Sequence, residues 1–429
     1  MLQLQSHKNN RYICFYIKIF HLKILQLNTY DQKGGAARAT YRLSKSLADI
    51  GADIRLLVRK KSFADSFTYA ANEKFSSAKA YFDYLPTLLF TRKRLPFFSA
   101  IINDNLLENV ALFRPDIIHL NWISEGFVKI ETLAKLNVPI VWTLHDSWSF
   151  TGGCHIPKGC LKYQTKCERC PYLSPKFKND LSSYNFERKL KAYAQIDIMQ
   201  IVTPSNWMRS EVVSSTLLKG RNVAVIPNCL DTDFYDGVNK EIAKSELRIS
   251  PENRVIIFGG INSTKDENKG FQFLLNALET VTTKDVVLIV FGNDKPKVQY
   301  ENGIEIKYLG KINNDEKLRT IYSAGDVTVV PSIQEVFGQV IIESMSCGTP
   351  VVAFNQTGPA EIIQHKKNGF LANPFEEGDL AKGIDWVLEN QSRWEMLSAN
   401  AVTFVRAHYS SEIIARKYIE LFKRVLGNK

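Results

Sequence analysis

The sequence lacks any run of eighteen or more uncharged apolar residues, so we expect no membrane-spanning helix. An apolar stretch at residues 12–17 is soon interrupted by Lys18, and no small-residue cleavage site follows, so no signal peptide is expected. No Gly-x-Gly-x-x-Gly follows the first strand predicted in either half of the chain, which argues against a Rossmann oxidoreductase. No recognised nucleic-acid module or basic low-complexity arm appears, so we expect no nucleic-acid partner.

Cysteine is sparse, with 7 among 429 residues, and most are not placed as the paired framework of a secreted domain. We therefore expect a cytoplasmic protein. Four of them, Cys154, Cys160, Cys167 and Cys170, lie within seventeen residues. The spacing of Cys167 and Cys170 is typical of a zinc knuckle, and the other two would complete a structural four-thiolate zinc site, with His155 as a substitute ligand. Disulfides and unligated thiols are the alternatives.

The length suits two domains of roughly 200 residues each. The formal net charge of +11 has no nucleic acid to explain it, so we expect peripheral contact with an anionic membrane, on the inner face of the cytoplasmic membrane. Residues 81–98 mix aromatic side chains with the basic residues 92–94, a composition that suits an interfacial patch. Ordinary packing of a helix with a solvated basic end is the simpler interpretation of that stretch.

The first convincing strand spans residues 22–27, and a loop with Gly34 and Gly35 then opens a helix. A strand, a glycine pair and a helix in this order suit the approach of a sugar or an anion to the backbone, and a plain tight turn is the alternative. A later buried strand ends in His145 and Asp146, at the carboxyl end where sites collect in parallel sheets. We expect Asp146 to orient the His145 imidazole.

The second half is organised around residues 326–353. A β-branched run over residues 326–332 predicts a buried parallel strand, a loop then carries Glu335, and Gly338 opens a helix that bears Glu343. Helix N-termini at strand ends bind anions, and a carboxylate accepts hydrogen bonds from a pair of vicinal hydroxyls. Two carboxylates flanking such a helix start predict a nucleotide-sugar site.

Glu335 and Glu343, with seven residues between them, with Phe337-Gly338 inside and a Cys-Gly-Thr-Pro-Val-Val strand after them, resemble the signature of the family 4 retaining glycosyltransferases. The resemblance covers the chain from about residue 22 to its end. It implies the α/β GT-B fold, in which two Rossmann-like domains face each other across a cleft. In that family the first glutamate contacts the transferred sugar and the second contacts the nucleotide ribose, which implies these roles for Glu335 and Glu343.

Other residues of the second half match the same family. Lys269 stands where a family lysine pairs with the donor diphosphate, and Gly292 lies in a loop resembling the one that lines the base pocket. The family commonly has an arginine a few residues before the lysine. This chain has none there, and Lys265 is the nearest substitute, although lysine lacks the bidentate fork. Thr357 replaces the first glycine of a family Gly-Gly pair.

In the first half, His145 resembles the family histidine that faces the donor sugar, and Gly34-Gly35 resemble a glycine pair near both substrates. The His-Asp pair followed by the cysteine insert looks like a subgroup of bacterial polysaccharide glycosyltransferases. We expect an extension over residues 1–21 and an acceptor-side domain over residues 22–230, with a cysteine-rich insert over residues 151–175. A donor-side domain would span residues 231–408, and a C-terminal helix over residues 409–429 would return to the first domain.

The implied reaction moves a hexosyl or related sugar from a nucleotide-sugar to a glycan or lipid-linked glycan acceptor, with retention of configuration, in O-antigen, capsule or exopolysaccharide biosynthesis. His145, Lys269 and Glu335 are the catalytic candidates, and no cofactor is required. The substrate-binding candidates are Gly34, Gly35, Lys265, Gly292, Phe337, Gly338 and Glu343. The alternatives are a non-catalytic nucleotide-sugar or glycan-binding subunit, or another GT-B enzyme such as a nucleotide-sugar epimerase.

Overall fold

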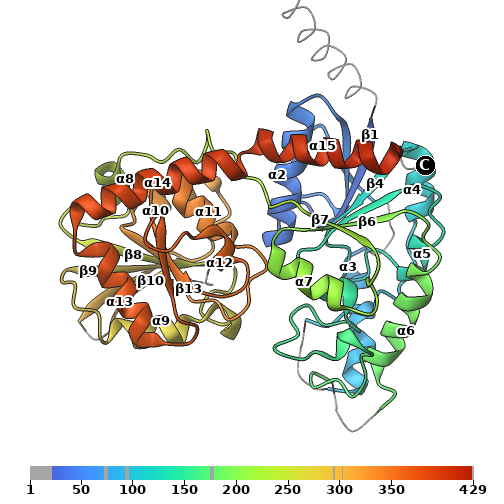
Figure 1. Ribbon diagram of the computed structural model, residues 1–429, viewed down its shortest axis with the longest axis horizontal. Helices are drawn as coiled ribbons and strands as arrows, with labels where there is room; N and C mark the ends of the chain where they lie inside the picture. Colours follow the sequence, from blue (N-terminus) through green and yellow to red (C-terminus); the bar gives the residue numbers. More distant parts are fainter. Residues whose placement is uncertain are drawn as a thin grey trace, which may run out of the picture. The chain divides into compact units, whose positions relative to one another are not determined.

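The computed structural model describes residues 22–71, 76–91, 96–173, 178–292, 295–301 and 303–427. The chain forms two compact units (Figure 1). The first runs up to Ile226 and also includes the residues from Ile414 onward, and the second is Pro227–Ile413. The division falls shortly before the boundary expected at residue 230. The extension predicted over residues 1–21 and the basic residues 92–94 lie outside the described residues.

The first unit is built on a sheet of parallel strands in the order β3-β2-β1-β4-β5-β6-β7. Its strands are β1 (Lys23–Tyr30), β2 (Asp53–Lys60), β3 (Thr68–Ala70), β4 (Ile117–Leu120), β5 (Ile140–Thr143), β6 (Met199–Thr203) and β7 (Asn222–Val225). Its helices include α2 (Gly35–Asp49), α3 (Ser76–Tyr84), η1 (Leu85–Leu89), α4 (Leu106–Phe113), α5 (Ile130–Leu133), η2 (Trp148–Phe150), η3 (Lys162–Gln164), α6 (Leu181–Tyr193) and α7 (Asn206–Ser214).

Strand β1 lies inside this sheet, and its residues from Ile24 to Thr29 are buried, as expected of a parallel strand covered on both faces. The strand is longer than predicted, because residues 28–30 continue it instead of starting the glycine loop. The loop after β4 satisfies their polar groups: the Trp122 backbone N–H donates to Asn28 Oδ1 at 2.9 Å, and the Thr29 N–H donates to the Trp122 carbonyl at 2.7 Å.

Helix α15 (Ser411–Gly427) contributes its residues from Ile414 onward to the first unit. The Tyr418 hydroxyl lies 2.9 Å from Thr143 Oγ1 at the end of β5, and the Tyr418 ring centroid lies 5.2 Å from that of His119. His119 is fully buried, and its ring bonds to Gln26 and Thr143. This strand-end histidine therefore belongs to the core.

The second unit contains a sheet in the order β10-β11-β9-β8-β12-β13-β14, in which the β10–β11 pair is antiparallel and the other described pairs are parallel. Its strands are β8 (Arg254–Gly259), β9 (Val286–Phe291), β10 (Lys297–Glu301), β11 (Ile304–Tyr308), β12 (Val327–Val330), β13 (Val351–Phe354) and β14 (Gly369–Ala372). Its helices include α8 (Lys240–Glu246), η4 (Glu267–Lys269), α9 (Phe271–Leu278), α10 (Asp315–Ala324), α11 (Gln339–Ser346), α12 (Pro359–Ile362), α13 (Glu377–Leu388) and α14 (Gln391–Tyr409).

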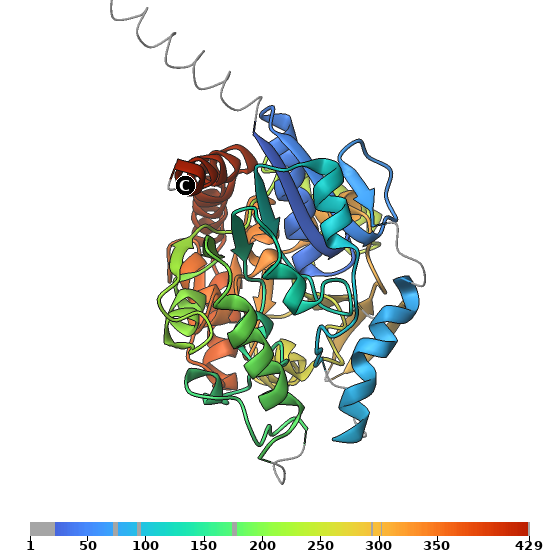
Figure 2. The same cartoon turned by 90° about the vertical axis from the view of Figure 1, so that its right-hand side faces the viewer.

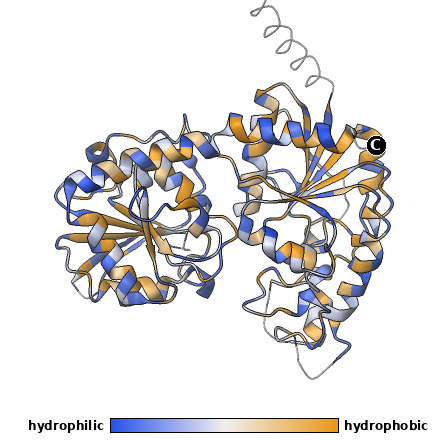
Figure 3. Ribbon diagram, in the orientation of Figure 1, coloured by the Kyte–Doolittle hydropathy of each residue, from blue (hydrophilic) through white to orange (hydrophobic). Residues whose placement is uncertain are grey.

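The apolar side chains of the second sheet feed two cores, one on each face. Successive side chains of a strand point to opposite faces, and in β8 Val255 and Ile257 join one cluster while Ile256 and Phe258 join the other. Helices α10, α11 and α14 cover the first cluster, and α9 and α13 cover the second. In Figure 3 the strands of both units are largely orange, while many helices carry one orange and one blue side.

Helix α3 and η1 expose several large apolar side chains. Figure 2 shows this segment in light blue, standing apart from the blue strands β1 and β2. Tyr81, Phe82, Leu88 and Leu89 are 61%, 51%, 47% and 83% exposed. Among the described residues, no helix is long and apolar enough to cross a membrane.

Candidate active site

Each sheet has a point where its strand order reverses direction. In the first unit it lies between β1 and β4, and in the second between β8 and β12. Ligands of open α/β sheets bind beyond the carboxyl ends of the strands at such points. The loops after these four strands carry Gly34, Asn121, Lys269 and Glu335, so three of the predicted site residues lie where the topology places a ligand.

Lys269 and Glu335 form an ion pair in the second unit, with 2.6 Å between Nζ and Oε2. Asn268 fixes the two loops to each other. Its side chain accepts from the Gln334 N–H at 3.1 Å and donates to the Gln334 carbonyl at 2.7 Å. Burial alone would lower the pKa of Lys269, but the Glu335 carboxylate more than offsets this and holds the lysine pKa above its usual value. The lysine is therefore fully charged, as a partner for a diphosphate must be.

Helices α9 and α11 start beside this pair, and each is preceded by a glycine with a positive φ angle. Gly270 has φ 72° and Gly338 has φ 121°, and neither helix has a side-chain cap or an acidic residue in its first turn. By contrast, Asn314 caps α10 in the same unit. A Cβ on Gly270 would lie 2.0 Å from the Pro331 carbonyl oxygen, so only glycine fits there. Both helix starts therefore keep backbone N–H groups that suit an anion.

The other two residues of the predicted signature point inward. Glu343 is 4% exposed, and its Oε2 accepts from the Tyr322 hydroxyl at 2.9 Å. Phe337 is also 4% exposed and packs edge-on against Tyr409, with 5.6 Å between ring centroids. Phe337 is therefore a core side chain that fixes the loop, and only its backbone is available to a ligand.

Gly292 lies against the loop that follows β8. It has φ 95°, and a Cβ there would lie 1.7 Å from the Gly260 carbonyl oxygen, so no side chain fits. Lys265 is exposed in that same loop, where its N–H donates to the Asn262 carbonyl at 2.9 Å. Gly292, which was predicted to line the base pocket, must therefore be glycine because the backbone of the loop after β8 lies against it.

Thr357, at the position where the family pattern has glycine, adopts φ 52°, which is unusual for a β-branched residue. Its Oγ1 accepts from the Glu335 N–H at 3.2 Å, and the next residue, Gly358, donates its N–H to the Glu335 carbonyl at 2.9 Å. The backbone of Glu335 is therefore held from both sides by this turn, which helps to compensate for the strain at Thr357.

In the first unit, His145 is half-buried after β5, and its Nε2 donates to Asn121 Oδ1 at 3.0 Å. Burial lowers the pKa of His145 to about 4, against a smaller opposing effect of Asp146. The imidazole is therefore neutral at physiological pH. Because Nε2 carries the proton, Nδ1 is left as a hydrogen-bond acceptor. Asn121, which the sequence analysis missed, orients this ring.

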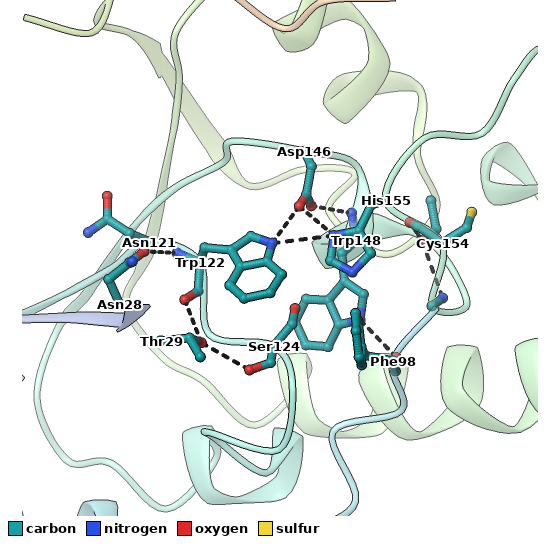
Figure 4. Close-up of polar contacts among 12 residues, drawn as sticks. Asn28, Thr29, Phe98, Asn121, Trp122, Ser124, Asp146, Trp148, Cys154 and His155 are labelled. Carbon is teal, nitrogen blue, oxygen red and sulfur yellow. Dashed lines mark hydrogen bonds and ion pairs between the residues drawn. The ribbon is translucent and has the colours of Figure 1, made fainter. Parts of the chain in front are cut away.

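The prediction that Asp146 orients His145 is wrong. Its carboxylate instead lies 2.5 Å from His155 Nδ1, and it accepts from the Trp122 indole N–H at 2.7 Å and the Trp148 backbone N–H at 2.8 Å (Figure 4). Burial would raise the pKa of Asp146, but the His155 contact and these donors hold it below its usual value. The Asp146 carboxylate points toward the insert, because the donors of His155, Trp122 and Trp148 lie there. The hydrogen-bond partner of His145 is Asn121 instead.

Trp122 is a further residue that the sequence analysis did not single out. It follows the carboxyl end of β4, is half-buried and stacks with Tyr30 at 6.1 Å between ring centroids. Its position so close after a predicted strand end was the available indication. Gly34, which precedes α2, has φ 105°, and neither it nor Gly35 has another group within 4 Å of the place a Cβ would occupy. Tyr30 ends β1, while Trp122 and this open turn follow the two strands of the switch point.

The four cysteines of the insert line one pocket, and none of them is in a disulfide. Burial raises the pKa of the Cys167 thiol to about 12, so the thiol is protonated at neutral pH. His155 is engaged by Asp146 through Nδ1, and in the described part of the chain its buried Nε2 has no hydrogen-bond partner, an arrangement compatible with a substitute metal ligand. Among the described residues, no group of three or more His, Cys, Asp or Glu side chains is arranged so that it could hold a metal ion. The structural zinc ion stays a prediction.

Comparison with known families agrees with this division of the chain. Residues 33–234 match the family described as Glycosyltransferase Family 4, and residues 239–403 match the family described as Glycosyl transferases group 1. Together the two segments span most of the chain. The protein therefore belongs to the GT-B glycosyltransferases of the group 1 and family 4 kind.

Two curated relatives illustrate the similarity. An uncharacterized glycosyltransferase of Methanocaldococcus jannaschii is 28% identical over 283 residues, which cover 63% of this chain and 70% of the relative. The putative colanic acid biosynthesis glycosyl transferase WcaC of Escherichia coli K12 is 22% identical over 429 residues, which cover 94% of this chain and all of the relative.

Solved structures confirm the fold. Sucrose-phosphate synthase from Thermosynechococcus elongatus superposes with a TM-score of 0.69 at 19% identity, over 95% of this chain and 100% of its own. HepE of Anabaena, solved in complex with UDP-glucose, gives a TM-score of 0.64 at 19% identity, over 94% of this chain and 100% of its own. The predicted architecture of two α/β domains with parallel sheets is therefore correct.

Proposed function

We propose that this glycosyltransferase moves a sugar from a nucleotide-sugar donor to a glycan or lipid-linked glycan acceptor, with retention of the anomeric configuration. The observation that carries the proposal is the ion pair between Lys269 and Glu335, set between two helix starts that have no side-chain cap. A charged lysine with free amide donors suits a diphosphate, and a carboxylate beside it suits the sugar hydroxyls. Both groups are about one quarter exposed, so a ligand can reach them.

In this proposal the residues divide the donor between them. Lys269 and the N–H groups at the start of α9 and α11 bind the diphosphate, and Glu335 accepts from hydroxyls of the transferred sugar. Glu343 contacts the ribose from farther along α11, and Gly292 and Lys265 lie on the loops near the base and phosphates. In the first unit, neutral His145 offers its Nδ1 as an acceptor to the donor sugar, and the Gly34-Gly35 turn admits the acceptor.

The chemical step then needs no protein nucleophile. The bond between the anomeric carbon and the phosphate oxygen breaks as the acceptor oxygen bonds to the same face of that carbon. The acceptor proton passes to the departing phosphate oxygen, so the nucleoside diphosphate leaves with the charge that Lys269 stabilises. Fixed positive charge aimed at a developing anion is worth several kcal/mol in a transition state.

The acceptor class is inferred from a relative. WcaC carries the description of a putative colanic acid biosynthesis enzyme and aligns over nearly the whole chain. We place the present protein in the biosynthesis of a bacterial cell-surface polysaccharide on that support, and the HepE complex with UDP-glucose makes a uridine nucleotide-sugar the first donor to try. No catalytic cofactor is part of the proposal.

A cytoplasmic enzyme that extends a lipid-linked glycan would work at the inner face of the membrane. The exposed side chains of α3 and η1, with a net charge of +11 for the chain, support peripheral binding to anionic lipid there. Sedimentation with phosphatidylglycerol vesicles tests this. Binding should weaken when Phe82 and Leu89 are both changed to Ser, and equal binding of wild type and variant would contradict it.

The first experiment is a thermal-shift panel of nucleotide-sugars on wild type, Glu335→Gln and the control Glu279→Gln, which alters an exposed residue after α9. A true donor should raise the melting temperature of wild type and control and do so less in Glu335→Gln. Anomeric analysis of the transfer product by NMR then tests retention. An inverted product would overturn the mechanism, and the absence of any nucleotide-sugar effect would overturn the donor assignment.

A further inference from the structure

The segment between η2 and α6 is long and irregular. Among its described residues, 151–173 and 178–180, the regular structure is the three-residue η3. Loops of this length in compact domains generally need something to hold them. The segment is nevertheless closely packed, because Tyr163 is 1% exposed and Cys167 and Cys170 are 9% and 7% exposed. A small apolar cluster around Phe97 accounts for only part of that packing.

Cysteine thiols gather in this segment from well-separated positions. Cys154, Cys160, Cys167 and Cys170 all line the same pocket, together with Phe97, and none forms a disulfide. Four cysteines that line one cavity have the side-chain chemistry of a thiophilic metal centre.

A backbone N–H donates to one of these sulfurs, an arrangement that stabilises a thiolate. The Gly152 N–H donates to Cys167 Sγ at 3.2 Å, and the Leu173 N–H donates to the Cys170 backbone carbonyl at 3.1 Å. Only glycine fits at position 152, because a Cβ there would lie 2.4 Å from the Ser182 carbonyl oxygen and 2.9 Å from Cys167 Cβ. Amide hydrogen bonds to sulfur are a recurrent feature of metal–thiolate sites, where they tune the charge on the ligands.

A buried lysine also lies beside the thiols. Lys189 is 1% exposed, its Nζ donates to the Thr151 carbonyl at 3.1 Å, and its charge favours the thiolate of Cys167. A divalent ion bound by four thiolates has a net charge of about −2, which is unfavourable in a protein interior without a compensating cation. Burial lowers the pKa of Lys189 to about 7, against the opposing effect of a Cys167 thiolate, so the amine gains its full charge only as thiolates form beside it.

We propose that Cys154, Cys160, Cys167 and Cys170 bind a four-thiolate metal centre that fixes the insert between η2 and α6. This inference goes beyond the glycosyl transfer and does not depend on it. The side chains line the pocket without being arranged to hold a single ion. Zinc therefore requires the cysteine side chains to turn inward, whereas an iron–sulfur cluster would occupy more of the pocket. The shared chemistry is thiolate coordination, and composition distinguishes the two.

The test is the metal content of the full chain, purified under reducing conditions without added metal. We expect about one equivalent of zinc per chain or, for a cluster, iron with acid-labile sulfide and visible absorbance. The bound metal should be lost in Cys167→Ser and in Cys170→Ser. Cys347→Ser, which alters a buried thiol of the second unit, is the matched control and should keep it.

If the variants fail to fold, the wild type still decides the question. A chelator should release the metal from the wild-type protein. The cysteine thiols should then react with a thiol reagent, and the melting temperature of the protein should fall. Wild-type protein without stoichiometric metal, whether its cysteines titrate as free thiols or appear as disulfides by non-reducing mass spectrometry, would overturn the proposal. Transferase activity and donor binding are measured on the same preparations, so failure of the metal site and failure of the proposed function are distinguishable.

Discussion

Lys269 Nζ lies 2.6 Å from Glu335 Oε2, and this contact joins the turn before α9 to the loop before α11. Lys269 ends the three-residue η4, and Glu335 lies in a loop, so neither residue is held by a long regular element. Asn268 supplies that support by bonding to both backbone groups of Gln334. The pair is therefore positioned before a donor arrives, and a diphosphate would meet a lysine that is already oriented.

Lys269→Ala and Glu335→Gln should each lower kcat by roughly 100-fold or more. The first change removes the positive charge that stabilises the departing diphosphate, and the second weakens the interaction with the sugar hydroxyls in the transition state. Steady-state transfer assays on both single variants and the double variant check this. Since the two side chains touch, the double variant should lose less than the product of the single losses. Wild-type turnover in Glu335→Gln would refute its assigned role.

Glu343→Gln should weaken nucleotide binding roughly tenfold while leaving turnover at saturating donor nearly unchanged, because the carboxylate is proposed to contact only the ribose. Titration calorimetry with the free nucleotide measures the affinity. Tyr322→Phe is the control for orientation, since it removes the hydroxyl that bonds to Glu343 and leaves the carboxylate in place. An unchanged affinity in Glu343→Gln would show that this buried carboxylate serves the fold alone.

Gly292→Ala should destabilise the protein by more than about 2 kcal/mol, because the new methyl group would meet the Gly260 carbonyl oxygen. Gly303→Ala is the matched control. It has φ 78° but no group within 4 Å of a Cβ, so it should show only the backbone strain of about 1 kcal/mol. Urea unfolding of both variants gives the comparison, and equal losses would mean that the loop after β8 moves away freely.

Thr357→Ser should stabilise the protein by roughly 0.5 kcal/mol and keep full activity, because serine retains the hydroxyl that accepts from the Glu335 N–H and is less strained at φ 52°. Thr357→Gly should remove the strain but raise KM for the donor, since the Glu335 loop loses that bond. Unfolding curves and donor KM values for the two variants separate strain from positioning. A rise in KM in Thr357→Ser would speak against this division.

Stability should fall as the pH drops below about 6.5. Burial lowers the pKa of His119 to about 3 and that of His145 to about 4, from an ordinary value of 6.5. Between these limits the unfolded chain binds more protons, so stability is full above the unfolded value and decreases toward the folded values. His119→Gln should flatten the loss between pH 6.5 and 4 relative to wild type, as measured by urea unfolding. His408→Gln, at an exposed residue of α14, should not.

Local pattern was enough to predict much of the fold, because buried parallel strands and amphipathic helices leave strong periodic traces. The strand, loop and helix around Glu335 could be placed in this way, and so could the helix that begins after Gly34. Strand β10 was missed because it is short and its two apolar residues, Val298 and Tyr300, although they alternate with polar ones, are 58% and 72% exposed. Its edge position depends on pairing with β11, which residue pattern does not specify.

Partner choice was the part of the site that could not be predicted. His145 and Asp146 are adjacent in sequence, yet their side chains bond to Asn121 and His155. Successive residues after a strand point in different directions. The hydrogen-bond partners that each side chain finds belong to loops from other parts of the sequence. Asn268 was passed over for the same reason, because its value lies in reaching Gln334 across the sheet edge.

Tyr418 reaches Thr143 from α15, so the first unit is made of two stretches at opposite ends of the chain. During synthesis, the strands up to β7 leave the ribosome long before residues 414–427 do. Until the whole second unit has been made, the first unit therefore lacks α15, and the side of His119 that Tyr418 covers stays exposed. Chains of this kind fold in the order that contacts become available, so here the last segment translated completes the first structure begun.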